Sequence, residues 1–403
     1  MNMKKINMRA FSKKYVTPQN VKIFILFIPL LILFIEQCRD GQVTLATFLD
    51  TGVLVSFILV FICDLVASLI SHIVGKRYED CTKLTTDYDM LVKKYCRERL
   101  IEYQGSIFPV ICQVFRRKEE TAFDMRFHYF DKKYELPKQI ADNSSHIMEA
   151  HSFSTVYNNT NIRINDICTD ENRITISYSM TTYFDSLITN RAMDFPIENN
   201  KSIREIYEPG PFLSTLSESR LSNHLGFNGF IELADGKVVF VVRNGNVSIG
   251  KHTLAGSIGA SLKTKYCLNE DRRLTDIGIS NAMRREIYDE LRIEIDETID
   301  LCNTVFAFYR DIVEGGKPQF LFYYRSDAIT SEQFDKKFFS DVRKHGIRKT
   351  DTVLDGTHFE YLSVAELKEC TITPGQIVFP NKKVYTMMPS AAASIVMFLQ
   401  YMS

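Results

Sequence analysis

Two long apolar runs near the start of the chain dominate its hydrophobic pattern. The first covers residues 16–38 after a basic leader, and the second covers residues 52–74. Each is long enough to cross a bilayer, because about 20 apolar residues rising ~1.5 Å each span a ~30 Å hydrocarbon core. Basic residues flank the outer ends of the pair, which places both chain termini in the cytoplasm. Residues 1–75 are therefore predicted to form a two-helix transmembrane hairpin.

Asp64 is the candidate functional residue of this hairpin. A carboxylate within a membrane usually faces a bundle interior, a pore or a proton path. The alternative is a protonated Asp64, or one bonded to Ser68, that only helps helices to associate. Two helices do not enclose a pore, so a membrane lesion would require several copies of the chain. A cleaved secretory signal is a competing interpretation of the first run, but residues 36–40 offer no small-residue cleavage site.

The hydrophobic period changes after the second run. Residues 76–104 carry apolar side chains at three- and four-residue spacing, which predicts a helical stalk. Residues 105–208 alternate with period two and predict a β-rich connecting region. Pro196, Pro209, Gly210 and Pro211 mark a boundary at its end, and the region is either a domain of its own or an edge of the next one. Its predicted elements are strands at 107–115 and 122–130 joined by a turn at 116–120, loops from 142 to 172 around a strand near 162–167, a strand at 173–182 and a helix at 183–192.

The remaining chain, 209–403, predicts an α/β/α sandwich with a mixed sheet. Its first elements are strands 226–233 and 237–243, joined by Asp235-Gly236, a strong hairpin signal. A small-residue loop, 254–260, comes next, followed by an acidic helix at 281–293. The later predicted elements are strands at 303–310 and 319–325 across Gly315-Gly316, a helix at 331–344 and an apolar helix at 389–402.

The acidic helix carries the candidate chemistry. Glu286, Asp289 and Glu290 stand at i, i+3 and i+4 and share one side of a helix. Clustered carboxylates favour a hard cation such as Mg²⁺, which takes oxygen ligands and often shares them with a substrate phosphate. The alternative is a solvated face with an ordinary Arg285–Asp289 ion pair. The neighbouring apolar stripe is Met283, Ile287 and Leu291.

The order of hairpin, glycine-bearing loop and acidic helix resembles the Nudix family. The family core reads here as Arg285-Glu286-Ile287-Tyr288-Asp289-Glu290. The resemblance implies that Glu286 acts as general base or metal ligand and that Asp289 and Glu290 bind Mg²⁺. Two positions depart from the pattern, since the family's glycine falls on Arg292 and its earlier glutamate on Ile277. These departures weaken catalysis without removing a nucleotide pocket.

Three further residues are candidate ligand contacts. Arg243 ends the second strand of the hairpin and could reach a phosphate, or it could be a surface charge. Gly256 and Gly259 would let the loop backbone approach a ligand. The insertion that follows the loop contains four basic side chains that could close over a phosphate or stay solvated: Lys263, Lys265, Arg272 and Arg273. A later strand contains two aromatic side chains that could stack a base or join the core: Tyr323 and Tyr324.

Composition narrows the possible partners. The 403 residues include 49 basic and 49 acidic side chains, so no global basic field favours long nucleic acids. The nine cysteines are scattered without zinc spacing, which suits small buried thiols in a reducing compartment. The eight histidines have no partner at nucleophile or metal spacing.

As a whole, the chain resembles the membrane-spanning Nudix-domain effectors of bacterial cyclic-oligonucleotide antiphage signalling (CBASS). The resemblance implies a cyclic nucleotide messenger as ligand, homo-oligomeric assembly in the lipid bilayer and disruption of the inner membrane. The alternative function is a membrane-tethered, Mg²⁺-dependent Nudix hydrolase of a nucleoside diphosphate derivative. We favour the receptor interpretation, because ligand binding can shift a population toward an assembled state by differential affinity alone.

Overall fold

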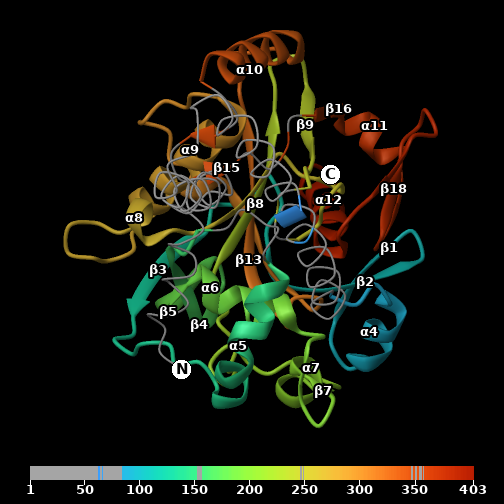
Figure 1. The fold of residues 1–403 in the computed structure, drawn as a ribbon. Helices are drawn as coiled ribbons and strands as arrows, with labels where there is room; N and C mark the ends of the chain where they lie inside the picture. The colour runs from blue at the N-terminus through green and yellow to red at the C-terminus, as the bar shows by residue number, and fades with distance from the viewer. Residues whose placement is uncertain are drawn as a thin grey trace, which may run out of the picture. The chain divides into compact units, whose positions relative to one another are not determined.

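The computed structural model describes most of the chain beyond its first 83 residues. The described residues are 62–63, 66, 84–151, 157–245, 247, 249–345, 348–349, 352–353, 356 and 358–403. The chain divides into two compact units, Met1–Asp80 and Cys81–Ser403. The second unit is a mixed α/β structure with several sheets (Figure 1).

The transmembrane prediction is corrected. Among the described residues, no helix has the length and apolar character that crossing a membrane requires. The predicted spanning helices at 16–38 and 52–74, and Asp64 with them, lie outside those residues apart from three positions of the second run. The finding overturns the two-helix hairpin as part of the fold and the multi-pass inner-membrane location.

The predicted stalk is also wrong where its residues are described. Only α4 (Tyr88–Lys94) is helical there, and β1 (Leu100–Tyr103) follows it. The apolar side chains that suggested a stalk include Leu91 and Tyr95, both fully buried against Ile312 and Val313. These apolar side chains therefore pack inside the second unit, and the helical spacing corresponds to one short helix of that unit.

The main sheet has nine strands and mixes both directions. Strands β13 and β8 run parallel, and the other neighbouring pairs run antiparallel. The hairpin of β8 and β9 turns at Gly236, whose φ is 74°, as its sequence predicted. The strand order is β1, β2 (Ser106–Phe115), β12 (Val305–Asp311), β13 (Lys317–Arg325), β8 (Gly226–Glu232), β9 (Lys237–Val242) and β10 (Leu254–Ala255), with β11 (Ile258–Ser261) beside β8 and β16 (His358–Ser363) beside β9.

Helices cover both faces of this sheet (Figure 1). Because side chains alternate along a strand, Phe227 and Ile231 of β8 join the core beneath α9 (Asp276–Leu291). Phe230 points the other way and stacks on Phe398 of α12 (Pro389–Tyr401) with ring centroids 4.5 Å apart. The predicted apolar stripe of α9 is confirmed, since Met283, Ile287 and Leu291 are all buried.

The connecting region contributes to more than one sheet. Its first strand, β2, pairs with β1 and β12, whereas β3 (Asp124–Tyr129) pairs with β5 (Arg173–Thr182) in a separate sheet completed by β4 (Thr160–Asp170). The predicted hairpin across residues 116–120 is therefore wrong. Arg116 is buried and donates to the carbonyls of Asn303 and Val305 at 2.7 and 2.9 Å, so it holds the end of β2 on the β12 segment.

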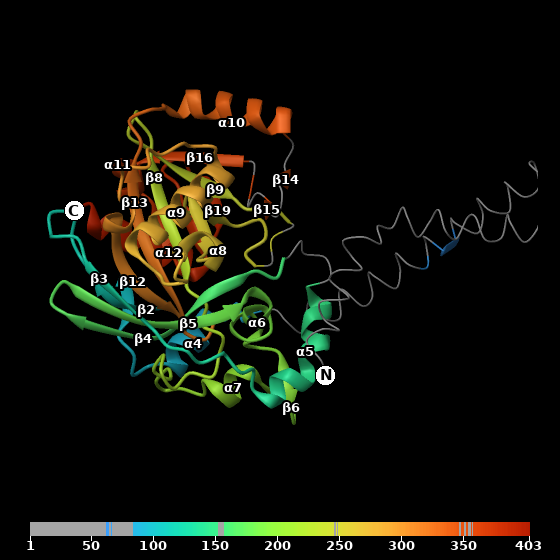
Figure 2. The same ribbon diagram turned by 90° about the vertical axis from the view of Figure 1, so that its left-hand side faces the viewer.

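Shorter elements complete the unit (Figure 2). The segment predicted as loops from residue 142 is helical at its start, because α5 (Lys138–Ala150) extends into it. The remaining elements are α6 (Tyr183–Leu187), η1 (Asn190–Ala192), β6 (Pro196–Glu198), β7 (Lys201–Ser202), α7 (Ile203–Tyr207), α8 (Thr264–Cys267), η2 (Cys302–Thr304), α10 (Ser331–His345), β14 (Arg348–Lys349), β15 (Thr352–Val353), α11 (Val364–Lys368), β17 (Thr371–Thr373), β18 (Gln376–Val378) and β19 (Val384–Thr386).

The two strands of the β8–β9 hairpin separate soon after their turn. They pair at Glu232 and Val238, after which β8 pairs with β11 and β9 pairs with β10. The Ser257 hydroxyl bridges the gap: it accepts from the Ile231 amide at 2.7 Å and donates to the Val239 carbonyl at 2.5 Å. We call this arrangement the β8–β9 fork.

Candidate functional site

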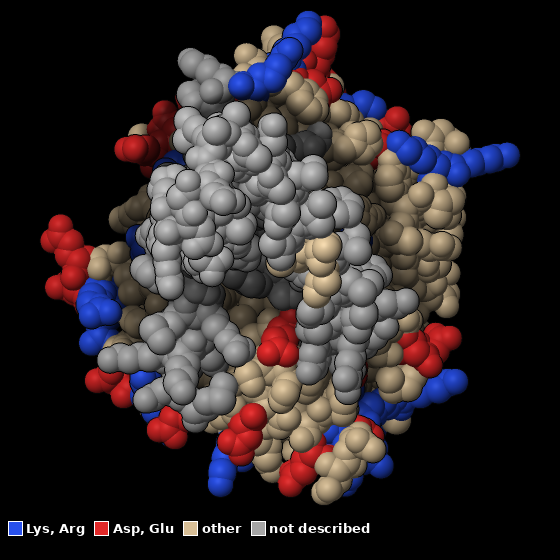
Figure 3. Space-filling model, viewed as in Figure 1, with Lys and Arg blue, Asp and Glu red and all other residues tan. Residues whose placement is uncertain are grey.

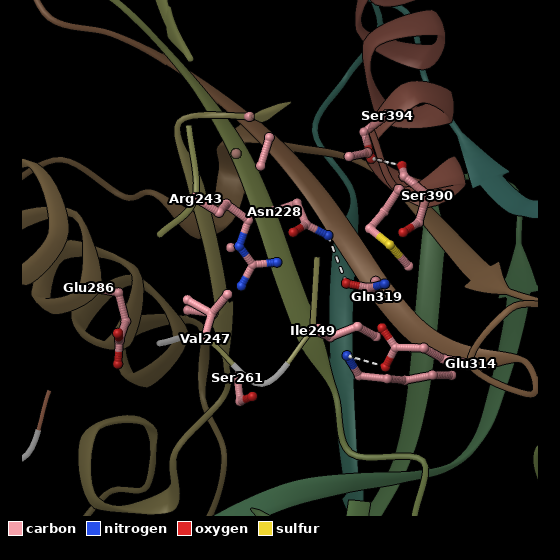
Figure 4. Close-up of a pocket in the computed structure, with 18 of the residues that line it drawn as sticks. Asn228, Arg243, Val247, Ile249, Ser261, Glu286, Glu314, Gln319, Ser390 and Ser394 are labelled. Carbon is pink, nitrogen blue, oxygen red and sulfur yellow. Dashed lines mark hydrogen bonds and ion pairs between the residues drawn. The ribbon is translucent and has the colours of Figure 1, made fainter. Parts of the chain in front are cut away.

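A cavity of about 210 Å³ lies in the β8–β9 fork. Its walls come from β8, from the loop between β10 and β11, from one side of α9, from the first turns of α12 and from the turn between β12 and β13 (Figure 4). Six residues chosen from the sequence line it together: Arg243, Gly256, Gly259, Lys263, Glu286 and Glu290. The fork thus gathers candidates that lie up to 47 positions apart in the chain.

Arg243 enters the cavity from the end of β9. Its amide donates to the Thr253 carbonyl at 2.9 Å, and its own carbonyl accepts from the His252 amide at 3.0 Å. This backbone return toward β10 fixes the residue at the mouth of the fork, and Figure 4 shows its side chain projecting into the cavity. Arg243 thus lines the cavity, and its predicted contact with a ligand phosphate stays a prediction.

Gly256 and Gly259 allow the chain between β10 and β11 to pack tightly against β8. A Cβ at Gly256 would lie 3.1 Å from the Gly229 carbonyl oxygen, and a Cβ at Gly259 would lie 3.2 Å from the Asn228 Oδ1 atom. Both distances are tighter than normal carbon contacts, so a side chain at either position would press on β8. Their small size lets the loop pack against the strand, in addition to exposing backbone to the cavity.

The three acidic residues of α9 do not act as one group. Glu286 and Glu290 line the cavity, whereas Asp289 is buried away from it and pairs with Arg285 at 2.9 Å. Glu286 is also buried and forms an ion pair with Lys263. Burial alone would lower the Lys263 pKa, but the Glu286 charge outweighs it and raises that pKa.

These carboxylates do not fit the Mg²⁺ site that the Nudix resemblance implies. Within the described ranges, no group of three or more His, Cys, Asp or Glu side chains is placed to hold a metal ion. The Lys263 ammonium and the Arg285 guanidinium already neutralise Glu286 and Asp289. A divalent cation would have to displace Lys263 before it could bind Glu286 and Glu290 together.

The two departures from the family pattern have structural counterparts. Arg292 ends α9 in the left-handed conformation, with φ of 59°, where a glycine would be relaxed. Its side chain donates to the Tyr288 carbonyl at 2.9 Å and pairs with Asp341 of α10 at 2.7 Å. Ile277 is 74% exposed near the start of the helix and contributes nothing to the cavity.

Sequence reasoning missed a second charged group in the cavity. Glu314, labelled in Figure 4, lies at the β12–β13 turn, 3.2 Å from Lys317 and 3.4 Å from Arg191 of η1, and all three side chains are largely buried. Burial would raise the Glu314 pKa, but the charges of Lys317 and then Arg191 outweigh it and lower that pKa. In the sequence, this group is indicated only by Glu314 and Lys317 on either side of Gly315-Gly316, a pattern that by itself predicts an ordinary turn.

Asp311 lies behind this group and is fully buried. Its burial, and then the nearby Glu314 charge, raises the pKa of Asp311 to about 6. One oxygen accepts from the Val313 amide at 2.9 Å. The β12–β13 turn thus carries a buried set of charges whose protonation depends on its neighbours.

Amide and aromatic side chains complete the lining. Asn228 and Gln319 stand side by side in the middle of the cavity, and Tyr157 and Tyr183 line it near Asn161. Asn161 is fully buried, and its Oδ1 has no hydrogen-bond partner among the described residues. Of the basic insertion only Lys263 reaches the cavity, and neither member of the aromatic pair Tyr323 and Tyr324 does.

Basic and acidic side chains are interspersed around the rim of the face in Figure 3, over the part drawn in colour. Comparison with known proteins does not supply an identity: no family model matches the chain, and no curated protein matches it.

Proposed function

We propose that the cavity binds a nucleotide and that the chain is a receptor for a nucleotide messenger, built on a divergent Nudix-like domain. The observation that carries the proposal is the set of groups gathered in the β8–β9 fork. Four cationic side chains, two tyrosines and several amides line one cavity. A nucleotide needs these three kinds of group, for phosphate, for base stacking and for base edges.

Charge favours a ligand with phosphate. The lining contains Arg191, Arg243, Lys263 and Lys317 against Glu286, Glu290 and Glu314, so its formal charge is four positive minus three negative, or +1. Glu286 and Glu314 are bound by lysines within the protein. Arg243 is the cation that enters the cavity from a strand end, and a guanidinium can hold phosphate through two parallel hydrogen bonds. We assign the phosphate contact to Arg243.

The cavity volume sets the scale of the ligand. About 210 Å³ lies below the ~300–1,000 Å³ usual for small-molecule pockets. The fork therefore suits one nucleotide unit, with the rest of a larger cyclic messenger outside it. This makes the nucleotide unit, rather than a complete ring, the feature that the cavity recognises.

The contacts of α9 fit a receptor that only binds its ligand better than they fit a metal-dependent hydrolase. Metal-dependent hydrolysis needs carboxylates free to hold the ion, and here Lys263 and Arg285 bind two of the three. Because the same ion pairs neutralise Glu286 and Asp289, these two carboxylates do not repel an anion bound beside Arg243. Binding by this route needs no metal.

The test is a binding screen with the full chain. The probes are AMP, GMP, cyclic di-AMP, cyclic di-GMP and ribose 5-phosphate, each with Mg²⁺ and with a chelator, and each recovered afterwards for chromatography. We expect a nucleotide to bind equally in both conditions and to be recovered unchanged. Arg243→Met should weaken binding about tenfold or more, since a hydrogen bond to a charged group contributes roughly 1.5–3 kcal/mol. The matched control is Arg126→Met, an exposed arginine on β3.

Two results would overturn the proposal. Absence of binding by every probe would remove the nucleotide assignment. Conversion of a probe only in the presence of Mg²⁺, abolished by Glu290→Gln, would replace the receptor by the hydrolase alternative.

A further inference from the structure

A chain of hydrogen bonds fixes the amides in the middle of the cavity. The Asn228 Nδ2 group donates to the Tyr309 hydroxyl at 2.6 Å and to Gln319 Oε1 at 2.7 Å. The Tyr309 hydroxyl lies 3.2 Å from the Ser394 hydroxyl, which donates to the Ser390 carbonyl in the first turn of α12 at 2.7 Å. The chain thus runs from a backbone carbonyl to the cavity wall.

The Tyr309 oxygen is the acceptor in the middle of this chain. The Ser394 hydroxyl and the Asn228 Nδ2 group both donate to it, at 3.2 and 2.6 Å. Burial raises the Tyr309 pKa, which keeps this hydroxyl protonated. Asn228 must therefore turn its NH₂ group toward Tyr309 and Gln319.

The consequence is one acceptor and one donor left for a ligand. Both hydrogens of Asn228 Nδ2 are used, so its Oδ1 atom is left over, on the side of Gly259. Gln319 accepts through Oε1, so its Nε2 group is left over. Within the described residues neither Asn228 Oδ1 nor Gln319 Nε2 has a hydrogen-bond partner, and both residues line the cavity (Figure 4).

We propose that Asn228 and Gln319 read the base of the bound nucleotide, through an edge that carries one donor beside one acceptor. Adenine presents such an edge: its N6 amino group would donate to Asn228 Oδ1, and its adjacent ring nitrogen would accept from Gln319 Nε2. The inference rests on the proposed nucleotide receptor. It adds that the amides recognise the base, so a sugar phosphate that lacks a base is not the complete ligand.

Gln319→Glu separates base reading from the other interactions. The carboxylate still accepts from Asn228, so the hydrogen-bond chain is retained, but the atom that faces the ligand changes from donor to acceptor. Two neighbouring acceptors no longer match adenine. They match the N1–H and N2–H₂ donors of guanine.

The experiment measures the affinity of the full chain for AMP, GMP and ribose 5-phosphate. For Gln319→Glu we expect AMP affinity to fall about ten- to hundredfold, since a base-edge pair contributes roughly 1–3 kcal/mol of discrimination, and the GMP-to-AMP ratio to rise. Ribose 5-phosphate affinity should stay unchanged. Gln319→Leu should weaken AMP and GMP equally, and it serves as the second variant if the carboxylate disturbs folding. The matched control is Gln376→Glu, an exposed glutamine on β18 outside the cavity.

The outcomes distinguish the two proposals. If AMP and GMP bind wild type and Gln319→Glu leaves their ratio unchanged, base reading by this pair is wrong while the receptor stands. The same holds if Gln319→Glu weakens ribose 5-phosphate as much as AMP. If no nucleotide binds the wild type, the receptor proposal fails, and base reading fails with it.

Discussion

Removing the Lys263 ammonium should destabilise the protein, because the buried Glu286 carboxylate beside it loses this partner. Lys263→Met keeps the length of the side chain and removes its charge, so Glu286 loses its ion pair with Lys263. The Glu286 side chain is 3% exposed and that of Lys263 is 16% exposed, so water does little to solvate the remaining charge. Breaking a buried ion pair from one side typically costs about 3–5 kcal/mol.

We expect the lower end of this range, because the lysine side chain still reaches solvent. A loss of about 3 kcal/mol corresponds to a fall in the melting temperature of roughly 6–9 °C, at ~2–3 °C per kcal/mol for a unit of this size. The double variant Lys263→Met/Glu286→Gln removes both charges and should recover to within ~1 kcal/mol of wild type. Circular dichroism at pH 7 measures the melting temperatures of both variants, because the raised Lys263 pKa keeps that side chain charged in wild type well above neutrality.

Magnesium provides a second measurement on the same variants. With the ammonium gone, Glu286 and Glu290 face the cavity together, and millimolar Mg²⁺ should raise the melting temperature of Lys263→Met through binding to the native state. Wild type should not respond. The matched control is Lys265→Met, an exposed lysine two positions along the chain. A Lys263→Met protein as stable as wild type, or a double variant no better than the single one, would refute the ion-pair argument.

Three further predictions concern the framework of the cavity. Asp311 has its pKa raised to about 6 from ~3.9 in an unfolded chain, so wild type should lose up to roughly 3 kcal/mol of stability as the pH rises from 4 to 6. Asp311→Asn should flatten this slope in urea unfolding at several pH values; an unchanged slope would contradict it. Ser257→Ala leaves one buried amide and one carbonyl unpaired and should cost about 1–3 kcal/mol by thermal unfolding, whereas a neutral result would remove its role in the fork. Gly278→Ala places a Cβ 1.9 Å from the Cys267 carbonyl oxygen and should destabilise the start of α9, seen as faster amide exchange there; wild-type exchange would contradict the contact.

Local patterns predicted the elements that depend on neighbouring residues. The Asp235-Gly236 turn, the buried stripe of α9 and the bounds of β5 all follow from short-range rules of turn chemistry and periodicity. Even so, α9 begins five residues earlier than predicted. Thr275 caps it by accepting from the Gly278 amide at 3.0 Å.

The errors arose where distant residues decide the outcome. Nothing within residues 107–130 shows that β2 pairs with β12 instead of β3. Glu286 and Glu290 do share the cavity side of α9, whereas Asp289 does not, and the sequence gives no sign that Lys263 reaches Glu286 from 23 positions away. The Glu314–Lys317 group depends in the same way on Arg191 from another segment. Residue types and spacing identified part of the cavity, and partners from elsewhere in the chain determined its chemistry.

The pairing of β2 with β12 also governs how this unit folds. Val110 pairs with Asp311, about two hundred residues later in the chain. A contact this distant is formed only after a large loss of chain entropy, and folding rates fall as such contacts dominate a topology. We therefore expect the β8–β9 hairpin and its fork to collapse early, and the strands on the β2 side of the sheet to join last. Until they do, the β12 edge stays open to other chains, so refolding yield should fall as protein concentration rises.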